Sequence, residues 1–248
     1  METINYNPNT QAEQGSSGPR FFPAHLFALC RFESFGEIHF ESHISAHINL
    51  SRSQHGFRPS HSTSRHLTKL TDFIVDDFNN NKPPLRTILA SIDIPKPFEK
   101  TSRHILSDKI TATSIPPIIQ KWLNSKMVRL SRTLFMSRMS HARYLPNGVP
   151  QGSALSPALF NLRLSSLPEL EDTLILSYAD VLILAARDKK ISTASTRLQT
   201  HLDLLESWLV TNHLSPSPFK SSVTLFTSDR RQLDQHPELK IFGERLPI

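Results

Sequence analysis

The sequence of 248 residues contains a single cysteine, Cys30, so no disulfide bond can form within the chain. The N-terminal residues lack an apolar signal core, and the longest apolar stretches are too short to cross a bilayer. Hydrophobic residues make up 38% of the chain, below the usual share for globular proteins, which allows only a thin core. These absences predict an intracellular protein, nuclear or cytoplasmic, with no membrane partner.

Positive charge is in excess, with 28 Lys and Arg against 22 Asp and Glu, for a net charge of +6. Such a balance favours polyanionic partners, nucleic acid first. The arginines of residues 129–143 predict phosphate contacts that tolerate any base sequence and weaken steeply with salt, by roughly 0.7–0.9 in the log–log slope per neutralised phosphate.

The order of strand and helix patterns predicts an α+β layer arrangement. Residues 1–20 are polar and are expected to be disordered. The expected strands are 85–94, 172–178, 181–186 and 221–228, with one or two more within 127–148. The expected helices are 62–80, 114–126, 156–167 (with Ser156 as N-cap and Pro157 first) and 189–214.

Two aspartates stand in apolar strand patterns, Asp93 near the end of one run and Asp180 inside another, "LILSYADVLILAA". Either aspartate alone is most simply a turn residue, because Asp caps its own backbone in tight loops. If the two strands lie in one antiparallel sheet, the carboxylates converge to within about 4–6 Å and repel unless a cation lies between them. Mg²⁺ prefers one or two protein carboxylates together with phosphate oxygens and water, so nucleotidyl transfer is a candidate reaction.

Five segments follow one another in the chain: "SQHGFRPSHSTSRHL" (53–67), "SIDIPKPFEK" (91–100), "NGVPQGSALSPALFNL" (147–162), "SYADVLILA" (177–185) and "FKSSVTLF" (219–226). In this order they resemble the motifs of reverse transcriptases of non-LTR retrotransposons, the LINE or jockey-like kind. The resemblance covers roughly residues 35–248. It implies a right-hand polymerase fold with an antiparallel palm sheet and packed helices. Fingers are expected at roughly 21–84 and palm at roughly 85–248, with the chain ending before a thumb.

The resemblance also implies a set of site residues. Asp93 and Asp180 would hold Mg²⁺ or Mn²⁺, and Lys220 would help neutralise or protonate the leaving pyrophosphate. Phe98 would be the aromatic gate beneath the incoming sugar, and Arg58 would face the triphosphate. Gln151 and Gly152 would lie along the template and nascent pair. The implied partners are an RNA template, a DNA primer and deoxynucleoside triphosphates.

The chain departs from the family pattern at two places. The family hairpin reads Tyr-Ala-Asp-Asp, whereas the last position here is Val181, which offers no oxygen to a cation. Pro97 removes a backbone N–H where amides are expected to hold the triphosphate. Three functions therefore stand open: an RNA-directed DNA polymerase domain with impaired catalysis, a non-catalytic nucleic-acid-binding remnant of a decayed element, or a product that folds poorly and has no function.

Overall fold

The structure is a computed structural model, and it describes residues 47–48, 50–58, 60–80, 84–149, 153, 155–232, 234–235 and 237–248. The expected disorder of residues 1–20 lies outside this range, as do Gln151 and Gly152. The described chain forms two compact units, one built mainly from residues 101–160 and the other from residues 50–100 and 161–248. The division into fingers and palm stays a prediction.

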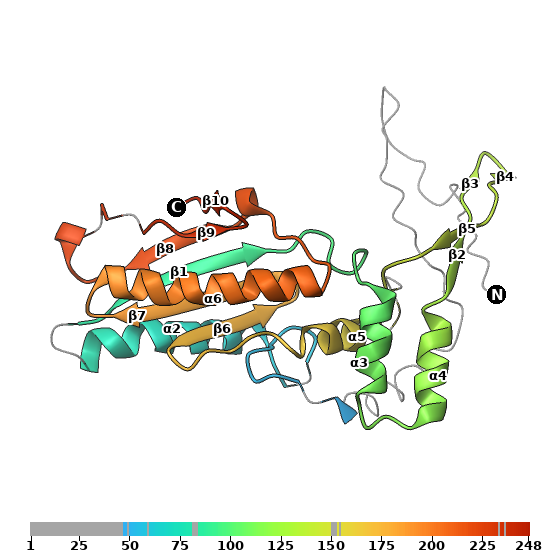
Figure 1. Ribbon diagram of the computed structural model, residues 1–248, viewed down its shortest axis with the longest axis horizontal. Helices are drawn as coiled ribbons and strands as arrows, with labels where there is room; N and C mark the ends of the chain where they lie inside the picture. The colour runs from blue at the N-terminus through green and yellow to red at the C-terminus, as the bar shows by residue number, and fades with distance from the viewer. Residues whose placement is uncertain are drawn as a thin grey trace. The chain divides into compact units, whose positions relative to one another are not determined.

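The second unit is built on one antiparallel sheet of four strands in the order β6-β7-β1-β8 (Figure 1). The strands are β1 (Arg86–Asp93), β6 (Thr173–Tyr178), β7 (Val181–Asp188) and β8 (Ser222–Phe226). The expected strands 85–94, 172–178 and 181–186 are thus confirmed, and they lie in one antiparallel sheet. In the two central strands, Ile88, Ala90 and Ile92 of β1 and Leu182, Leu184 and Ala186 of β7 are fully buried.

Helix α6 (Ile191–Thr211) packs against β7 and β1, and Figure 1 shows it lying along the sheet. This is the helix expected over 189–214, and its leucines at 198, 202, 205 and 209 are all fully buried. Helix α2 (Thr63–Asn80) contacts β6. The α2 helix begins as the sequence predicts, because Ser62 Oγ accepts a hydrogen bond from the backbone N–H of Arg65 at 3.2 Å. Two short helices, η2 (Pro218–Lys220) and η3 (Arg230–Gln232), and the pair β9 (Lys240–Ile241) and β10 (Glu244–Arg245) complete this unit.

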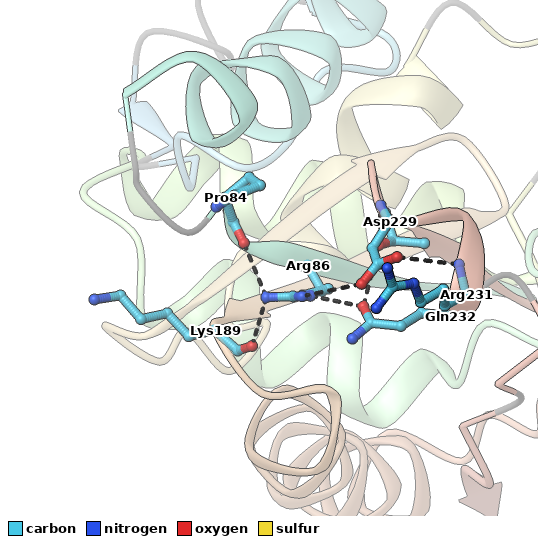
Figure 2. A network of polar contacts seen from close by, with 7 residues as sticks. Pro84, Arg86, Lys189, Asp229, Arg231 and Gln232 are labelled. Carbon is cyan, nitrogen blue, oxygen red and sulfur yellow. Dashed lines mark hydrogen bonds and ion pairs between the residues drawn. The ribbon is translucent and has the colours of Figure 1, made fainter.

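The end of the sheet where β1 begins is fixed by Arg86 (Figure 2). Its guanidinium donates to the carbonyls of Pro84 at 3.1 Å and Lys189 at 2.9 Å and to Gln232 Oε1 at 2.7 Å, and it lies 4.0 Å from the carboxylate of Asp229. Because β1 runs from Arg86 to Asp93, this network lies roughly 23 Å along the strand from Asp93. It therefore anchors the strand without occupying the end that carries the aspartates.

The first unit contains α3 (Arg103–Thr111) and α4 (Pro117–Lys126), which contact each other, and four short strands. The strands are β2 (Arg129–Ser131), β3 (Leu134–Phe135), β4 (Arg138–Met139) and β5 (Arg143–Leu145), with β2 paired to β5 and β3 paired to β4. One or two strands were expected here. The strand ladder is interrupted between β2 and β3, because the backbone N–H of Thr133 donates to the Ser140 hydroxyl at 2.9 Å and not to a backbone carbonyl.

Helix α5 (Leu155–Leu164) corrects the expected cap at Ser156. Ser156 lies inside the first turn and is buried, while Ser153 Oγ accepts from the Leu155 N–H at 3.3 Å. The expectation was wrong because proline is tolerated anywhere in the first turn of a helix, where no backbone N–H has an intrahelical partner. Pro157 is therefore the third residue of α5 and not the first. Among the helices described, none is both long and apolar enough to cross a bilayer.

Candidate active site

Asp93 is the last residue of β1, and its backbone is held on both sides. Its N–H donates to Ser221 Oγ at 3.2 Å, and its carbonyl accepts from the Ser217 N–H at 2.8 Å. The carboxylate is half-buried, and its Oδ2 has no hydrogen-bond partner among the residues that the structure describes. A buried carboxylate oxygen without a donor is costly unless a cation meets it. The backbone is thus fixed while one carboxylate oxygen is left for a ligand.

Asp180 lies in the two-residue turn that joins β6 to β7, between the paired residues Tyr178 and Val181. Ala179 has φ +52° and Asp180 does not have a positive φ, which is the φ pattern of a type II′ turn. The Asp180 carbonyl accepts from the N–H of Ile94 at 3.0 Å, directly after Asp93. The structure therefore brings both predicted aspartates to one end of the sheet. Their carboxylate separation of about 4–6 Å stays a prediction.

Val181 is the register partner of Asp93 across β1 and β7. Directly opposed residues of an antiparallel pair have Cβ atoms about 4.5–5.5 Å apart, so this position is within reach of any ion held by Asp93. Within the described residues, no group of three or more His, Cys, Asp or Glu side chains is placed to hold a metal ion. The Asp93 and Asp180 pair still suits one divalent cation whose other ligands are phosphate oxygens and water.

The loop of residues 51–58 lies along the free edge of β6 and reaches the Asp180 turn. The N–H of His55 donates to the Ser177 carbonyl at 2.9 Å, and the N–H of Ser177 donates to the Ser53 carbonyl at 2.8 Å. A Cβ on Gly56 would stand 2.5 Å from the backbone nitrogen of Ala179. Only glycine allows this approach, so Gly56 sets how closely the loop packs on the turn that carries Asp180.

Phe98 lies in the loop after Asp93, half-buried, with its ring edge-to-face against Phe57 at 5.8 Å between centroids. Asn161 of α5 holds the Phe57 side of this contact: its Nδ2 donates to the Phe57 carbonyl at 2.7 Å, and its Oδ1 accepts from Gln54 at 2.7 Å. Arg58 donates to the Ser51 carbonyl of its own loop at 3.0 Å. The roles of Phe98 and Arg58 toward a nucleotide stay predictions.

Arg163, two residues further along α5, ties the end of the Phe98 loop to α6. Its fully buried guanidinium donates to the carbonyl of Asn212, at the C-terminal end of α6, and to the carbonyl of Lys100 at 3.5 Å. Burial lowers the pKa of Arg163 to about 10, which leaves it charged at neutral pH. The sequence analysis did not identify Asn161 and Arg163, because the local sequence "NLR" does not indicate contacts with carbonyls that are distant in the chain.

Lys220 ends η2 on the segment whose Ser217 N–H binds the Asp93 carbonyl. This connection brings the lysine's segment to the aspartate end of the sheet, and the Lys220 side chain is exposed. Glu99, in the same loop as Phe98, forms an exposed ion pair with Lys96 at 3.8 Å. The catalytic role of Lys220 stays a prediction.

Three histidines behind the Asp180 turn were also missed. The ring of His55 lies 5.2 Å from that of His61 and 5.3 Å from that of His66, and His66 lies 5.7 Å from Tyr178. Burial and the nearby cation of Lys69 lower the pKa of His66 and lower that of His55 to about 4. Both rings are therefore neutral at pH 7 and pack as apolar side chains. The signal in the sequence was the recurrence of histidine within "HGFRPSHSTSRH". It was overlooked because histidines are also scattered through the rest of the chain.

A protein family and several curated relatives are similar to this chain. The family described as reverse transcriptase (RNA-dependent DNA polymerase) matches residues 39–245. The RNA-directed DNA polymerase from mobile element jockey of Drosophila melanogaster is 29% identical over 170 residues, which are 64% of this chain and 18% of the relative. A probable RNA-directed DNA polymerase from transposon BS of the same species is 27% identical, over 70% of this chain and 20% of the relative. The chain thus spans about a fifth of the length of these curated relatives.

Solved structures of telomerase from Candida tropicalis share the fold. The apo enzyme truncated from its C-terminal domain gives a TM-score of 0.54 at 15% identity, over 77% of this chain and 39% of that chain. The complex with a TWJ fragment of telomeric RNA gives 0.57 at 13% identity, over 79% and 33%. The α+β fold of reverse transcriptase palm and fingers predicted from the motifs is therefore confirmed. The family match over residues 39–245 shows that the chain belongs to the reverse transcriptase (RNA-dependent DNA polymerase) family.

Proposed function

We propose that this chain carries an RNA-directed DNA polymerase site, with its nucleotidyl-transfer chemistry impaired at Val181. The carrying observation is the half-buried Asp93, whose Oδ2 has no partner among the described residues, at the same sheet end as the Asp180 turn. The family match supports a divalent cation as cofactor, and the donor set of carboxylates suits Mg²⁺ or Mn²⁺. The substrates are an RNA template, a DNA primer and deoxynucleoside triphosphates.

The chain's own residues divide the work in this proposal. Asp93 and Asp180 hold the cation, which when bound neutralises phosphate oxygens and lowers the barrier to displacement. Phe98, braced by Phe57, lies beneath the sugar of the incoming nucleotide, and Arg58 approaches its phosphates. Lys220 neutralises or protonates the leaving pyrophosphate, and Gln151 and Gly152 line the template and nascent pair.

Val181 and Pro97 limit the rate. At Val181 a carboxylate that would share the cation with Asp93 is replaced by a hydrocarbon, and Pro97 has no N–H for a phosphate oxygen. Losing a charged metal ligand removes several kcal/mol of transition-state stabilisation, and about 1.36 kcal/mol is a factor of ten in rate. The expected loss from Val181 alone is about a thousandfold or more.

Extension of a labelled DNA primer on an RNA template tests the proposal with four proteins: the unchanged chain, Val181→Asp, Asp93→Asn, and the double variant. We expect trace extension by the unchanged chain, more by Val181→Asp, and none by either Asp93→Asn protein. Extension that survives Asp93→Asn would show a contaminating polymerase. No gain in Val181→Asp over its Asp93→Asn counterpart, in Mg²⁺ or Mn²⁺, would refute the site and favour a non-catalytic remnant.

A further inference from the structure

The first unit carries a long stretch without negative charge. Between Asp108 and Glu169 the sequence contains no aspartate or glutamate. The stretch includes a basic ribbon, residues 128–145, in which four arginines and one histidine are the only ionisable side chains besides Tyr144. A surface of this kind attracts polyanions. Every basic side chain of the ribbon is an arginine or a histidine, and none is a lysine. Arginine binds phosphate with two parallel hydrogen bonds and stacks on flat rings, which lysine does not.

The basic ribbon is a two-stranded arm. Its base is the β2–β5 pair and its tip is the β3–β4 pair, joined by a hydrogen bond from the Ser140 N–H to the Thr133 carbonyl at 2.9 Å. Eight residues lead from Arg129 to the tip residue Met136, so the arm has a contour of roughly 25 Å. Its length suits contact with several successive nucleotides.

Apolar side chains are exposed along this arm. Phe135 is 69% exposed and Met136 is 77% exposed at the tip, and Tyr144 is 56% exposed at the base. Phe135 is the register partner of Arg138, so an open aromatic ring and a guanidinium stand side by side on one face. Single exposed apolar residues need no explanation, but a run of them between arginines indicates a binding surface.

The turn at the tip supports the same conclusion. Met136 and Ser137 have φ +46° and +62°, the φ pattern of a type I′ turn, which Asn and Gly favour. A methionine with a positive φ is strained, and at this exposed position its apolar side chain does not contribute to a core. A ligand that contacts the tip would account for both features.

We propose that the basic ribbon binds single-stranded nucleic acid, with a base stacked on Phe135 and the neighbouring phosphates held by Arg138 and Arg143. Tyr144 contributes less, because the Arg103 guanidinium lies 4.9 Å from its ring centroid and covers one face. Bases of a duplex are stacked on each other and cannot reach Phe135, so the surface prefers single strands. The proposal deepens the proposed function by naming a second contact with its substrate class, but it requires no catalysis.

Fluorescence anisotropy of a labelled unstructured RNA of about 20 nucleotides tests the ribbon, in EDTA and without nucleotides so that no polymerase step takes part. Base stacking on one aromatic ring gives about 1–3 kcal/mol, so Phe135→Ala should weaken single-strand binding by about 5- to 140-fold. Arg138→Gln should lower the slope of log affinity against log salt by about 0.7. The matched controls on α4 are Ile118→Ala, at an apolar residue that is 78% exposed, and Lys121→Gln, and both should bind nearly as the unchanged chain does.

The same measurements on a duplex RNA and on vesicles with anionic lipid separate the alternatives. We expect Asp93→Asn to bind RNA unchanged, which distinguishes failure of the ribbon from failure of the polymerase site. Equal losses in Phe135→Ala and Ile118→Ala, or equal affinity for single strand and duplex, would overturn the proposal. Loss of vesicle binding but not of RNA binding in Phe135→Ala would assign the ribbon to a membrane surface instead.

Discussion

Replacing Val181 by aspartate tests the aspartate end of the sheet directly, because Val181 is the register partner of Asp93. With Cβ atoms about 4.5–5.5 Å apart, the two carboxylates would stand about 5 Å from each other. Their repulsion at that distance is about 1 kcal/mol in water and about 3 kcal/mol at the effective dielectric of a protein surface. This repulsion is absent in the unfolded chain, where the two residues are not held together, so the free energy of unfolding should fall.

Val181→Asn is the matched control, because it loses the same half-buried methyl groups and adds no charge. In EDTA at pH 7, Val181→Asp should be less stable than Val181→Asn by about 1–3 kcal/mol, measured by urea denaturation. Saturating Mg²⁺ should reverse the order, since a ligand at 100 times its Kd adds about 2.7 kcal/mol to the folded state. Mg²⁺ should stabilise Val181→Asn much less.

Two outcomes would refute the metal-site geometry. If the Asp and Asn variants unfold at the same urea concentration in EDTA, the side chain at 181 does not face Asp93. If Mg²⁺ stabilises both variants equally, the cation does not bind between β1 and β7.

Further predictions concern the loop that packs behind the Asp180 turn. Gly56→Ala should cost about 1–3 kcal/mol in urea denaturation, since its Cβ would stand 2.5 Å from a backbone nitrogen, and Ala179→Gly should not rescue it because the clash is with backbone. For His55, whose pKa falls from 6.5 unfolded to about 4 folded, the unfolded state takes up the proton first as pH drops. The free energy of unfolding should therefore fall by about 2–3 kcal/mol from this group between pH 7 and 4.5, and His55→Phe should remove that share while His104→Gln, at an exposed histidine, should not. A Gly56→Ala protein as stable as the unchanged chain, or a loss of stability between pH 7 and 4.5 that is as large in His55→Phe as in the unchanged chain, would contradict these contacts.

The sheet and its aspartates could be predicted from sequence because the signals are local. An apolar run flanked by turn residues favours a buried strand, and an aspartate at its end favours a turn or a ligand site. The expectation that these strands lie in one sheet followed from apolar runs that carry the two acids, whereas the pairing of β1 with β7 came from the structure. The helix α6 followed from leucines recurring at helical spacing.

The features that sequence reasoning missed depend on contacts between distant residues. Helix α3 lacks a side-chain cap and buries only Leu106 and Ile110, so its pattern was too weak to predict. The need for glycine at position 56 comes from the β6–β7 turn, more than 120 residues away in the chain. The expected cap of α5 at Ser156 was wrong because one proline fits several positions of a first turn, and Ser153 Oγ accepts from the Leu155 N–H ahead of it.

Fold and chemistry are separable in this chain because the two departures from the family pattern both suit the fold. Val181 begins an apolar strand, where valine is a favoured residue and a second carboxylate would be a liability without metal. Pro97 is buried in the loop after Asp93, where Lys96 has φ +52° and the Lys100 N–H closes the turn on the Lys96 carbonyl at 3.1 Å. A proline there stiffens the loop and lowers the entropy of the unfolded chain. Stability of this protein is therefore no measure of its activity: Val181→Asp should raise the rate of synthesis while lowering the free energy of unfolding in the absence of metal.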